Sequence, residues 1–354
     1  MNTTHETSRL GRIDAARGIG IILVVLGHAI RPGMVAEPWC DFLFRLIYSF
    51  HMPLFFVLSG FTFALTCRKY ISAPVTFLKK RTHSLLIPLL TWAATIYLCF
   101  FVAYRIPPIG AMLESSSFEW IDPLRYLYLT FVWENPYAAH LWYLWVLLVI
   151  TLVAFLIARL FRGAERWRTV LLLLSLPCFV IALLFPIPTA LRKMSAYLLF
   201  FAVGALLERF SERLLKPRAL TTVISLISTA LLIAVTLLST AGILPDSRTP
   251  LLLKNLLLTV AVFPAILGLL QLCDRLSSLR LLTAAGRGSF AVYLLHQPFC
   301  CGFAGIVLYD RLGLPSLPVL VLCTALSFCF PSLVVWLSRR VRWIGRITHA
   351  LLNI

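Results

Sequence analysis

Long apolar runs, each broken by only a few polar residues, repeat along the whole chain. Each run is about 20 residues long, which is the length that a helix needs to cross the hydrocarbon core of a membrane. Of the 354 residues, 60% are hydrophobic and 13% are charged, so no soluble domain of useful size remains. The pattern predicts an all-α, polytopic membrane protein with about ten transmembrane helices, at roughly 13–33, 43–66, 84–104, 140–158, 169–186, 194–210, 219–240, 253–272, 288–308 and 316–338.

Basic residues gather in alternate loops of this plan. With the N-terminus placed in the cytoplasm, 23 of the 32 lysines and arginines fall on the inner side, and every inner loop is basic. This positive-inside pattern predicts that both termini are cytoplasmic. The net charge of +18 is then mainly a consequence of membrane topology. Nucleic acid is therefore not expected as a partner.

No linker or repeat divides the chain, and 1–354 is therefore read as one integral-membrane domain. A polar, disordered cytoplasmic tail is expected at 1–12 and a basic cytoplasmic tail at 339–354. The longest outer loop, about 105–139, is the segment large enough to cap an outer opening.

The first span carries two ionisable side chains on one face, Arg17 and His28. Eleven residues separate them, so they project within about 20° of each other and about 16 Å apart along the helix. Ionisable groups inside a spanning helix are costly and usually face a cavity or a partner. The pair predicts a polar tunnel with Arg17 near its inner end and His28 near its outer end.

The second span adds His51, at an outer depth similar to that of His28, and Ser59 deeper in the membrane. We therefore expect the two imidazoles to face one cavity.

The ninth span places Ser289, Tyr293 and His296 within about 60° on one helix face. Counted from the cytoplasmic end of this span, His296 lies about 12 Å deep. That depth predicts that His296 closes the inner end of the cavity, on the opposite half of the membrane from His28.

The fourth span opens with His140, Trp142 and Tyr143. Trp and Tyr at a span end are usually interfacial residues, although near an outer mouth they also suit stacking on a sugar. His140 is interpreted as a polar residue that bridges two helices. No metal site is expected, because zinc needs three or four close ligands and these imidazoles are spread over four helices.

The inner loop after the second span is basic and includes Lys79, Lys80 and Arg81. One interpretation is a topology anchor that also touches anionic lipid. The alternative is a cytoplasmic site for the phosphates of a donor substrate.

Several of these stretches together resemble the family-3 membrane acyltransferases, bacterial inner-membrane enzymes that O-acylate, usually O-acetylate, surface polysaccharides and related glycoconjugates. Arg17 and His28 have the spacing of the family's R-x10-H signature, and FHMPLFFVLSGF in the second span matches its next landmark. HLWYLWVLL at 140–148 and SFAVYLLH at 289–296 match later landmarks, so the resemblance covers about residues 10–340.

The resemblance implies a multi-pass protein of the bacterial inner membrane with no bound cofactor, which takes acetyl-CoA or another acyl-CoA from the cytoplasm as co-substrate. It implies a glycan or glycolipid acceptor, with His28 as catalytic residue and Arg17 supporting the donor or the transition state. Where the family has R-x-x-R in the inner loop, this chain has Arg81-Thr-His-Ser84, so the second arginine is missing. The acceptor, the acyl chain and the oligomeric state are not specified.

These residues suit acyl transfer. A histidine with a pKa near 6.5 can take the proton of a hydroxyl and pass it to the leaving thiolate, while His51, Ser59, Trp142, Tyr143 and the face formed by Ser289, Tyr293 and His296 line the channel. Direct transfer and an acyl-histidine relay both remain open. The alternatives are a secondary transporter of a sugar or lipid-linked glycan that uses buried His and Arg, and a structural partner of a polysaccharide synthase.

Overall fold

The computed structural model describes residues 2–115, 118–132, 135–161, 166–244 and 248–353, and within these ranges every regular element is a helix. Nine helical segments in the same ranges are long and apolar enough to cross a membrane. They are α2 (Pro38–Cys67) with η2 (Arg68–Tyr70); α3 (Pro74–Arg81), η3 (Thr82–Leu86) and α4 (Ile87–Tyr104) as one run; η4 (Ala139–Leu141) with α7 (Trp142–Leu160); α8 (Arg166–Leu184); α9 (Thr189–Arg209); α11 (Ala219–Thr240); α12 (Arg248–Leu276); α14 (Ser289–Leu295), η5 (His296–Phe303) and η6 (Ile306–Arg311) as one run; and α15 (Ser316–Arg340). The predicted all-α, multi-pass membrane fold is confirmed.

The helix α1 (Asn2–Ala29) contains the predicted first span but is not among the nine. Because it contains Arg12, Asp14 and Arg17, this helix is less apolar than the other spans. It nevertheless lies inside the bundle, where it packs against α2, α12, α14, α15 and the short helix α13 (Arg280–Arg287). Because neighbours surround α1, its polar face can line an internal space.

The N-terminal tail differs from the sequence-based expectation. The segment 1–12 was expected to be disordered, yet α1 begins at Asn2. This stretch has no proline and one glycine, so little in it opposes helix formation. The basic C-terminal segment contains α16 (Arg342–Leu352), which packs on α15 and α4 and exposes Trp343 and Ile347 on one face. Such an amphipathic helix suits a membrane surface.

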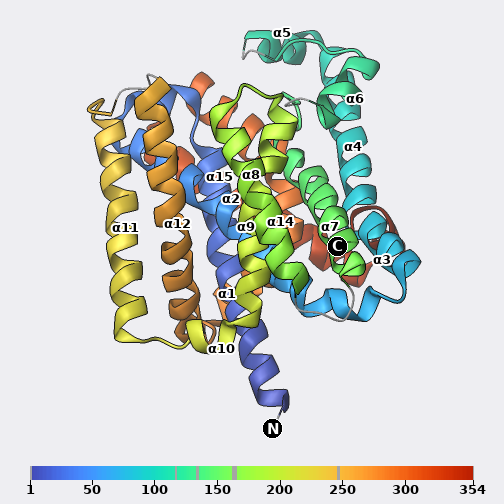
Figure 1. Ribbon diagram of the computed structural model, residues 1–354. Coiled ribbons are helices and arrows are strands. Elements are labelled where there is room, and N and C mark those ends of the chain that lie inside the picture. The colour runs from blue at the N-terminus through green and yellow to red at the C-terminus, as the bar shows by residue number, and fades with distance from the viewer. Residues whose placement is uncertain (1, 116–117, 133–134, 162–165, 245–247, 354) are drawn as a thin grey trace.

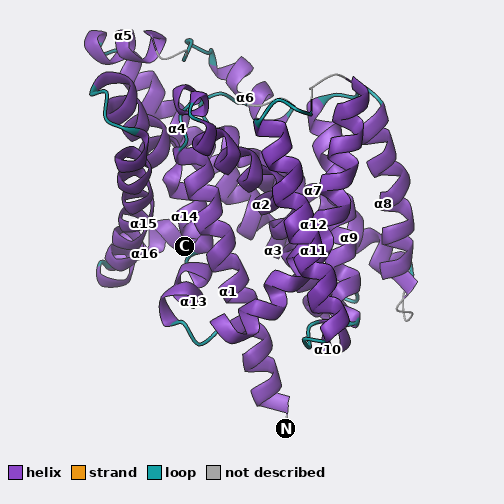
Figure 2. Cartoon of the chain, turned by 90° about the vertical axis from the view of Figure 1, so that its left-hand side faces the viewer, coloured by secondary structure: helices purple, strands orange, loops and turns teal. Residues whose placement is uncertain are grey.

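The helices stand side by side in one bundle (Figure 1). The short helices α5 (Pro107–Ser115) and α6 (Pro123–Phe131) lie over one end, while α10 (Ser211–Leu214) and the N-terminus lie at the other. The view turned by 90° shows the same two ends (Figure 2). The remaining short element, η1 (Pro32–Ala36), links α1 to α2. The expected outer loop 105–139 is thus largely helical at the end of the bundle opposite the N-terminus.

Two glycines allow α2 and α9 to pack closely. A Cβ atom on Gly60 would come within 1.9 Å of the carbonyl oxygen of Phe201, and one on Gly204 within 2.0 Å of the carbonyl oxygen of Val57. Any side chain at either position would push the two helices apart. This contact fixes the part of α2 that carries Ser59 against α9.

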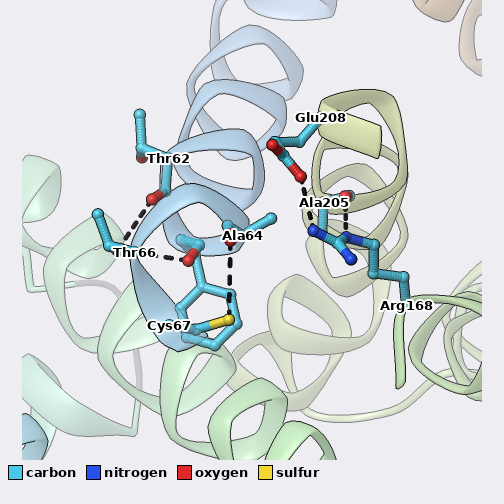
Figure 3. A network of polar contacts seen from close by, with 8 residues as sticks. Thr62, Ala64, Thr66, Cys67, Arg168, Ala205 and Glu208 are labelled. Carbon is cyan, nitrogen blue, oxygen red and sulfur yellow. Dashed lines mark hydrogen bonds and ion pairs between the residues drawn. The ribbon is translucent and has the colours of Figure 1, made fainter. Parts of the chain in front are cut away.

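A polar network also holds α8 to α9 near the end of α2 (Figure 3). The buried Arg168 guanidinium donates from Nη2 to Glu208 Oε2 at 2.6 Å and from Nε to the Ala205 carbonyl at 3.1 Å. On α2, Thr66 and Cys67 donate to carbonyl groups of their own helix. Removing Glu208 would leave the Arg168 charge buried without its carboxylate, which is costly.

Candidate active site

A central cavity of about 510 Å³ runs between α1, α2, η3, α7, α9, α13 and α14. Nearly all the predicted site residues line it: Arg17, His28, His51, Ser59, Arg81, Trp142, Tyr143, Ser289 and Tyr293. Four cations and no carboxylate occur among its described lining residues, the cations being Arg17, Arg81, Lys193 and Arg287. Such a space attracts an anionic ligand.

Three of these cations come from the end of the bundle that the sequence predicts to face the cytoplasm. Arg17 lies near the middle of α1, Arg81 ends α3, and Arg287 ends α13. The Arg81 guanidinium lies 5.2 Å from the centre of the Phe77 ring, which holds it against the bundle. Arg287 makes a long ion pair of 3.9 Å with Asp14. The inner-loop motif lacks its second arginine here, but Arg287 from another helix lines the same cavity as Arg81.

The two lysines beside Arg81 do not reach the cavity. Lys79 and Lys80 are exposed, and Lys80 donates from Nζ to the Tyr70 hydroxyl at 3.2 Å. All three residues belong to one helix, α3, and successive residues of a helix point about 100° apart. One residue of the three faces the bundle and the others face away from it.

Three histidines lie together at the end of the cavity away from Arg17: His28 and His140 line it, whereas the fully buried His296, which was also predicted to line it, is not among its described lining residues. The ring centres of His28 and His296 are 5.2 Å apart, and those of His140 and His296 are 5.5 Å apart. His51 joins through Tyr48, whose ring centre is 5.0 Å from His51 and 6.1 Å from His28. His28 itself has no hydrogen-bond partner among the described residues.

The hydrogen bonds of two rings define their tautomers. His51 Nδ1 lies 2.6 Å from the Ile47 carbonyl, and His296 Nδ1 lies 3.0 Å and 2.8 Å from the carbonyls of Val292 and Tyr293. A carbonyl can only accept, so Nδ1 carries the proton in both rings and Nε2 is left as an acceptor in the neutral form. The Nε2 atoms of His140 and His296 are buried and have no partner among the described residues.

The position of His296 corrects the sequence-based expectation that it lies on the opposite half of the membrane from His28. That depth was counted from residue 288, but α13 already packs along α1, with Gly286 against the backbone of Asp14. Asp14 to His28 is fourteen residues, or about 21 Å, and Gly286 to His296 is ten residues, or about 15 Å. These lengths bring the two rings to levels that differ by only about 6 Å, in agreement with the 5.2 Å between their ring centres.

Hydroxyl groups line the cavity between the arginines and the histidines. The Ser59 and Tyr143 hydroxyls lie 3.0 Å apart, and the Tyr293 hydroxyl donates to the His140 carbonyl at 2.6 Å. Ser289 lines the same cavity nearer the arginines.

The outer arm of the central cavity is aromatic and polar. Trp142 packs against Tyr197, with 5.3 Å between the ring centres, and Lys193 Nζ lies 4.4 Å from the centre of the Trp142 ring. Aromatic faces with polar tips are suited to a sugar.

A second space, the outer chamber, has a volume of about 450 Å³ and shares only His28 and His140 with the central cavity among its described lining residues. Its wall comes from α4, α5, η5 and the segment before η4, and it is mainly carbon, with Phe100, Ala103, Leu113, Phe118, Phe299 and Ile306 among its members. His140 was interpreted from the sequence as a bridge between helices, yet it forms part of the border between the two spaces.

Several lining residues had no usable signal in the sequence. Tyr48, Lys193, Tyr197 and Arg287 reach the central cavity from three different elements, α2, α9 and α13. Lys193 and Arg287 stand at span ends, where a cation is ordinary. His140, by contrast, was visible as a histidine at the start of a span. No three His, Cys, Asp or Glu side chains in the described part of the chain are placed to hold a metal ion.

Residues 10–336 match the family described as acyltransferase domain. The chain belongs to this acyltransferase family. The match contains α1, α2, α7 and α14, which carry the four landmark stretches, so the family expected from the sequence is confirmed.

Two similar proteins are both called nodulation protein NolL. The one from Sinorhizobium fredii is 29% identical over 207 residues, which are 56% of this chain and 49% of the relative. The one from Mesorhizobium japonicum is 32% identical over 125 residues, which are 34% of this chain and 32% of the relative. The chain thus spans at most about half the length of these relatives. No solved structure matches it.

Proposed function

We propose that this acyltransferase-family protein is an O-acyltransferase of the bacterial inner membrane that moves an acetyl group from cytoplasmic acetyl-CoA to a hydroxyl of a glycan or glycolipid. One observation supports the proposal: a single cavity is lined by three arginines, at the end predicted to be cytoplasmic, and by His28. Membrane lipid surrounds the bundle, and nucleic acid has no role.

The arginine end suits the phosphates of CoA. Guanidinium groups bind phosphate oxygens in pairs, and Arg17, Arg81 and Arg287 line the same cavity from three helices. Arg17 and His28 are about 16 Å apart along α1, a distance that the extended pantetheine arm can cover. Arg17 is therefore assigned to donor binding, because it is too far from His28 to touch the reacting carbonyl as well.

At the other end, His28 acts as general base. Its ring nitrogen takes the proton of the acceptor hydroxyl, the oxygen attacks the thioester carbonyl carbon, and the carbon–sulfur bond breaks. The same nitrogen then gives the proton to the thiolate, so that ester and free CoA are the products. Tyr143 and Ser59 hold the donor arm below the histidines, and the outer arm with Trp142 receives the sugar.

The test is labelled-acetyl transfer in native membrane vesicles, which contain the natural acceptor, comparing wild type with His28→Ala at equal folded amounts. Loss of the general base should lower transfer about 10²- to 10⁴-fold while labelled acetyl-CoA still binds. His83→Ala is the matched control, because His83 lies beside His349 and lines neither space. Passage of a labelled sugar without CoA release or CoA binding would instead support a transporter.

A further inference from the structure

The outer chamber is a built space that the mechanism above does not use. It borders the reaction centre, because His28 and His140 belong to its wall as well as to that of the central cavity. Phe100 and Ala103 on α4, Leu113 on α5 and Phe299 on η5 surround the remainder. A ligand group that passes His28 therefore enters surroundings of carbon atoms.

Polar groups are a minority in the chamber wall, and several of them are engaged elsewhere. Tyr137 donates its hydroxyl to the Glu119 carbonyl, and burial raises the pKa of Tyr137, so this hydroxyl stays protonated. Arg31 donates from Nη2 to Asp310 Oδ2 at 2.5 Å, and the backbone carbonyl of Gln297 accepts from Trp92 Nε1 at 3.3 Å. Arg31 Nε and His140 Nε2 are buried without a partner among the described residues, and most of the remaining wall is carbon.

The size of the chamber also exceeds what acetyl transfer needs. A methyl group is about as large as a water molecule, whose share of liquid volume is about 30 Å³. The chamber holds about 450 Å³ beside the central cavity. A mainly apolar space of this size gains van der Waals contacts when an apolar group fills it.

The orientation of the bound donor indicates which chemical group fills the outer chamber. With CoA in the central cavity and its carbonyl at His28, the acyl group continues away from the sulfur. Two spaces lie beyond this point: the outer arm with Trp142, Lys193 and Tyr197, which suits a sugar, and the outer chamber, which suits carbon. Resting on the proposed function, we propose that the outer chamber is the acyl pocket, so that acyl-CoA donors with chains longer than acetyl also bind at this site, and bind more tightly than acetyl-CoA.

This assignment changes the role of the segment 105–139. Leu113 and Phe118 from this segment cover the acyl pocket. The segment would then set the length of the transferred chain, whereas its position alone suggested a role in choosing the acceptor.

The experiment measures donor binding, so it does not depend on knowing the acceptor. Labelled acetyl-CoA bound to proteoliposomes is displaced by unlabelled acetyl-, butyryl- or hexanoyl-CoA. Each methylene that moves from water into an apolar site improves binding about fourfold, so butyryl-CoA should bind roughly sixteenfold tighter than acetyl-CoA. Hexanoyl-CoA should gain more until the chain fills the pocket.

Ala103→Phe tests the location of the chain. The added ring fills the pocket, so the advantage of the longer donors should disappear while acetyl-CoA binding changes less than about twofold. Val102→Phe on the same helix is the matched control, because Val102 is 51% exposed and does not line the chamber. Phe303→Ala, at the exposed edge of the chamber, supplies a second variant that should weaken hexanoyl-CoA binding and spare acetyl-CoA.

Three results would overturn the acyl pocket. The first is that longer donors bind no tighter than acetyl-CoA in the wild type, and the second is that Ala103→Phe and Phe303→Ala leave the advantage of the longer donors intact. An equal loss for every donor in both variants, with normal binding in Val102→Phe, would also refute it. If acetyl-CoA does not bind the wild type at all, the proposed function fails instead.

Discussion

The two spaces that meet at His28 differ sharply in what lines them. The central cavity carries four cations and the Ser59 and Tyr143 hydroxyls, whereas the outer chamber is walled mainly by carbon. A buried cation is stabilised by a ligand or a partner of opposite charge, and an apolar hollow gains contacts when an apolar group fills it. The difference between the two spaces is what we expect of a site for a molecule with a charged group at one end and an apolar group at the other.

Among the variants that distinguish the two spaces, we expect the largest effect on activity from a substitution at the arginine end of the central cavity. Arg17→Ala removes a charged partner of the donor phosphates, which is worth about 1.5–3 kcal/mol, so the KM for acetyl-CoA should rise about tenfold to hundredfold. The preference among chain lengths should not change, because Arg17 does not line the outer chamber. Initial rates against donor concentration measure both quantities.

Lys79→Ala is the matched control for that experiment, since Lys79 is an exposed cation that lines neither space. Its KM should stay within about twofold of wild type. A larger effect from Lys79 than from Arg17 would place the phosphates on the inner loop and break the assignment of the central cavity.

A smaller effect is expected at the hydroxyl pair between the two ends. Tyr143→Phe and Ser59→Ala each remove one side of a 3.0 Å hydrogen bond, and a neutral hydrogen bond is worth about 0.5–1.5 kcal/mol. Each variant should lose about twofold to tenfold in kcat/KM, and the double variant should lose less than the product of the two. Thr95→Val, on α4 away from both spaces, controls for loss of a hydroxyl; purely multiplicative losses would mean that the pair does not act as a unit.

Helix periodicity was sufficient to predict which residues line the site wherever those residues lie on one helix. Arg17 and His28 line one cavity because eleven residues return to the same face, and the spans carrying His51, Ser59 and Tyr143 were readable as apolar runs. The level of His296 was misjudged because α13 packs beside α1 before the predicted span begins, which only tertiary contacts define.

Other features depend on parts of the chain that no local pattern connects. In the sequence, Lys79 and Arg81 were equally good candidates for phosphate binding. The orientation of α3 directs Arg81 into the central cavity and leaves Lys79 exposed. The outer chamber could not be predicted, since its wall combines α4, α5 and η5 with the segment around Tyr137. Ordinary apolar residues such as Ala103 acquire a role only where these elements meet.

The most direct measurement is the sidedness of the donor. Labelled acetyl-CoA, which does not cross a sealed membrane, is supplied to native membrane vesicles of either inside-out or right-side-out orientation, and label in the glycan fraction is counted. If the arginine end faces the cytoplasm, only inside-out vesicles should transfer the acetyl group from external donor, and Arg17→Ala should reduce that transfer. Transfer from external donor in right-side-out vesicles alone would contradict the orientation of the site and the path through His28.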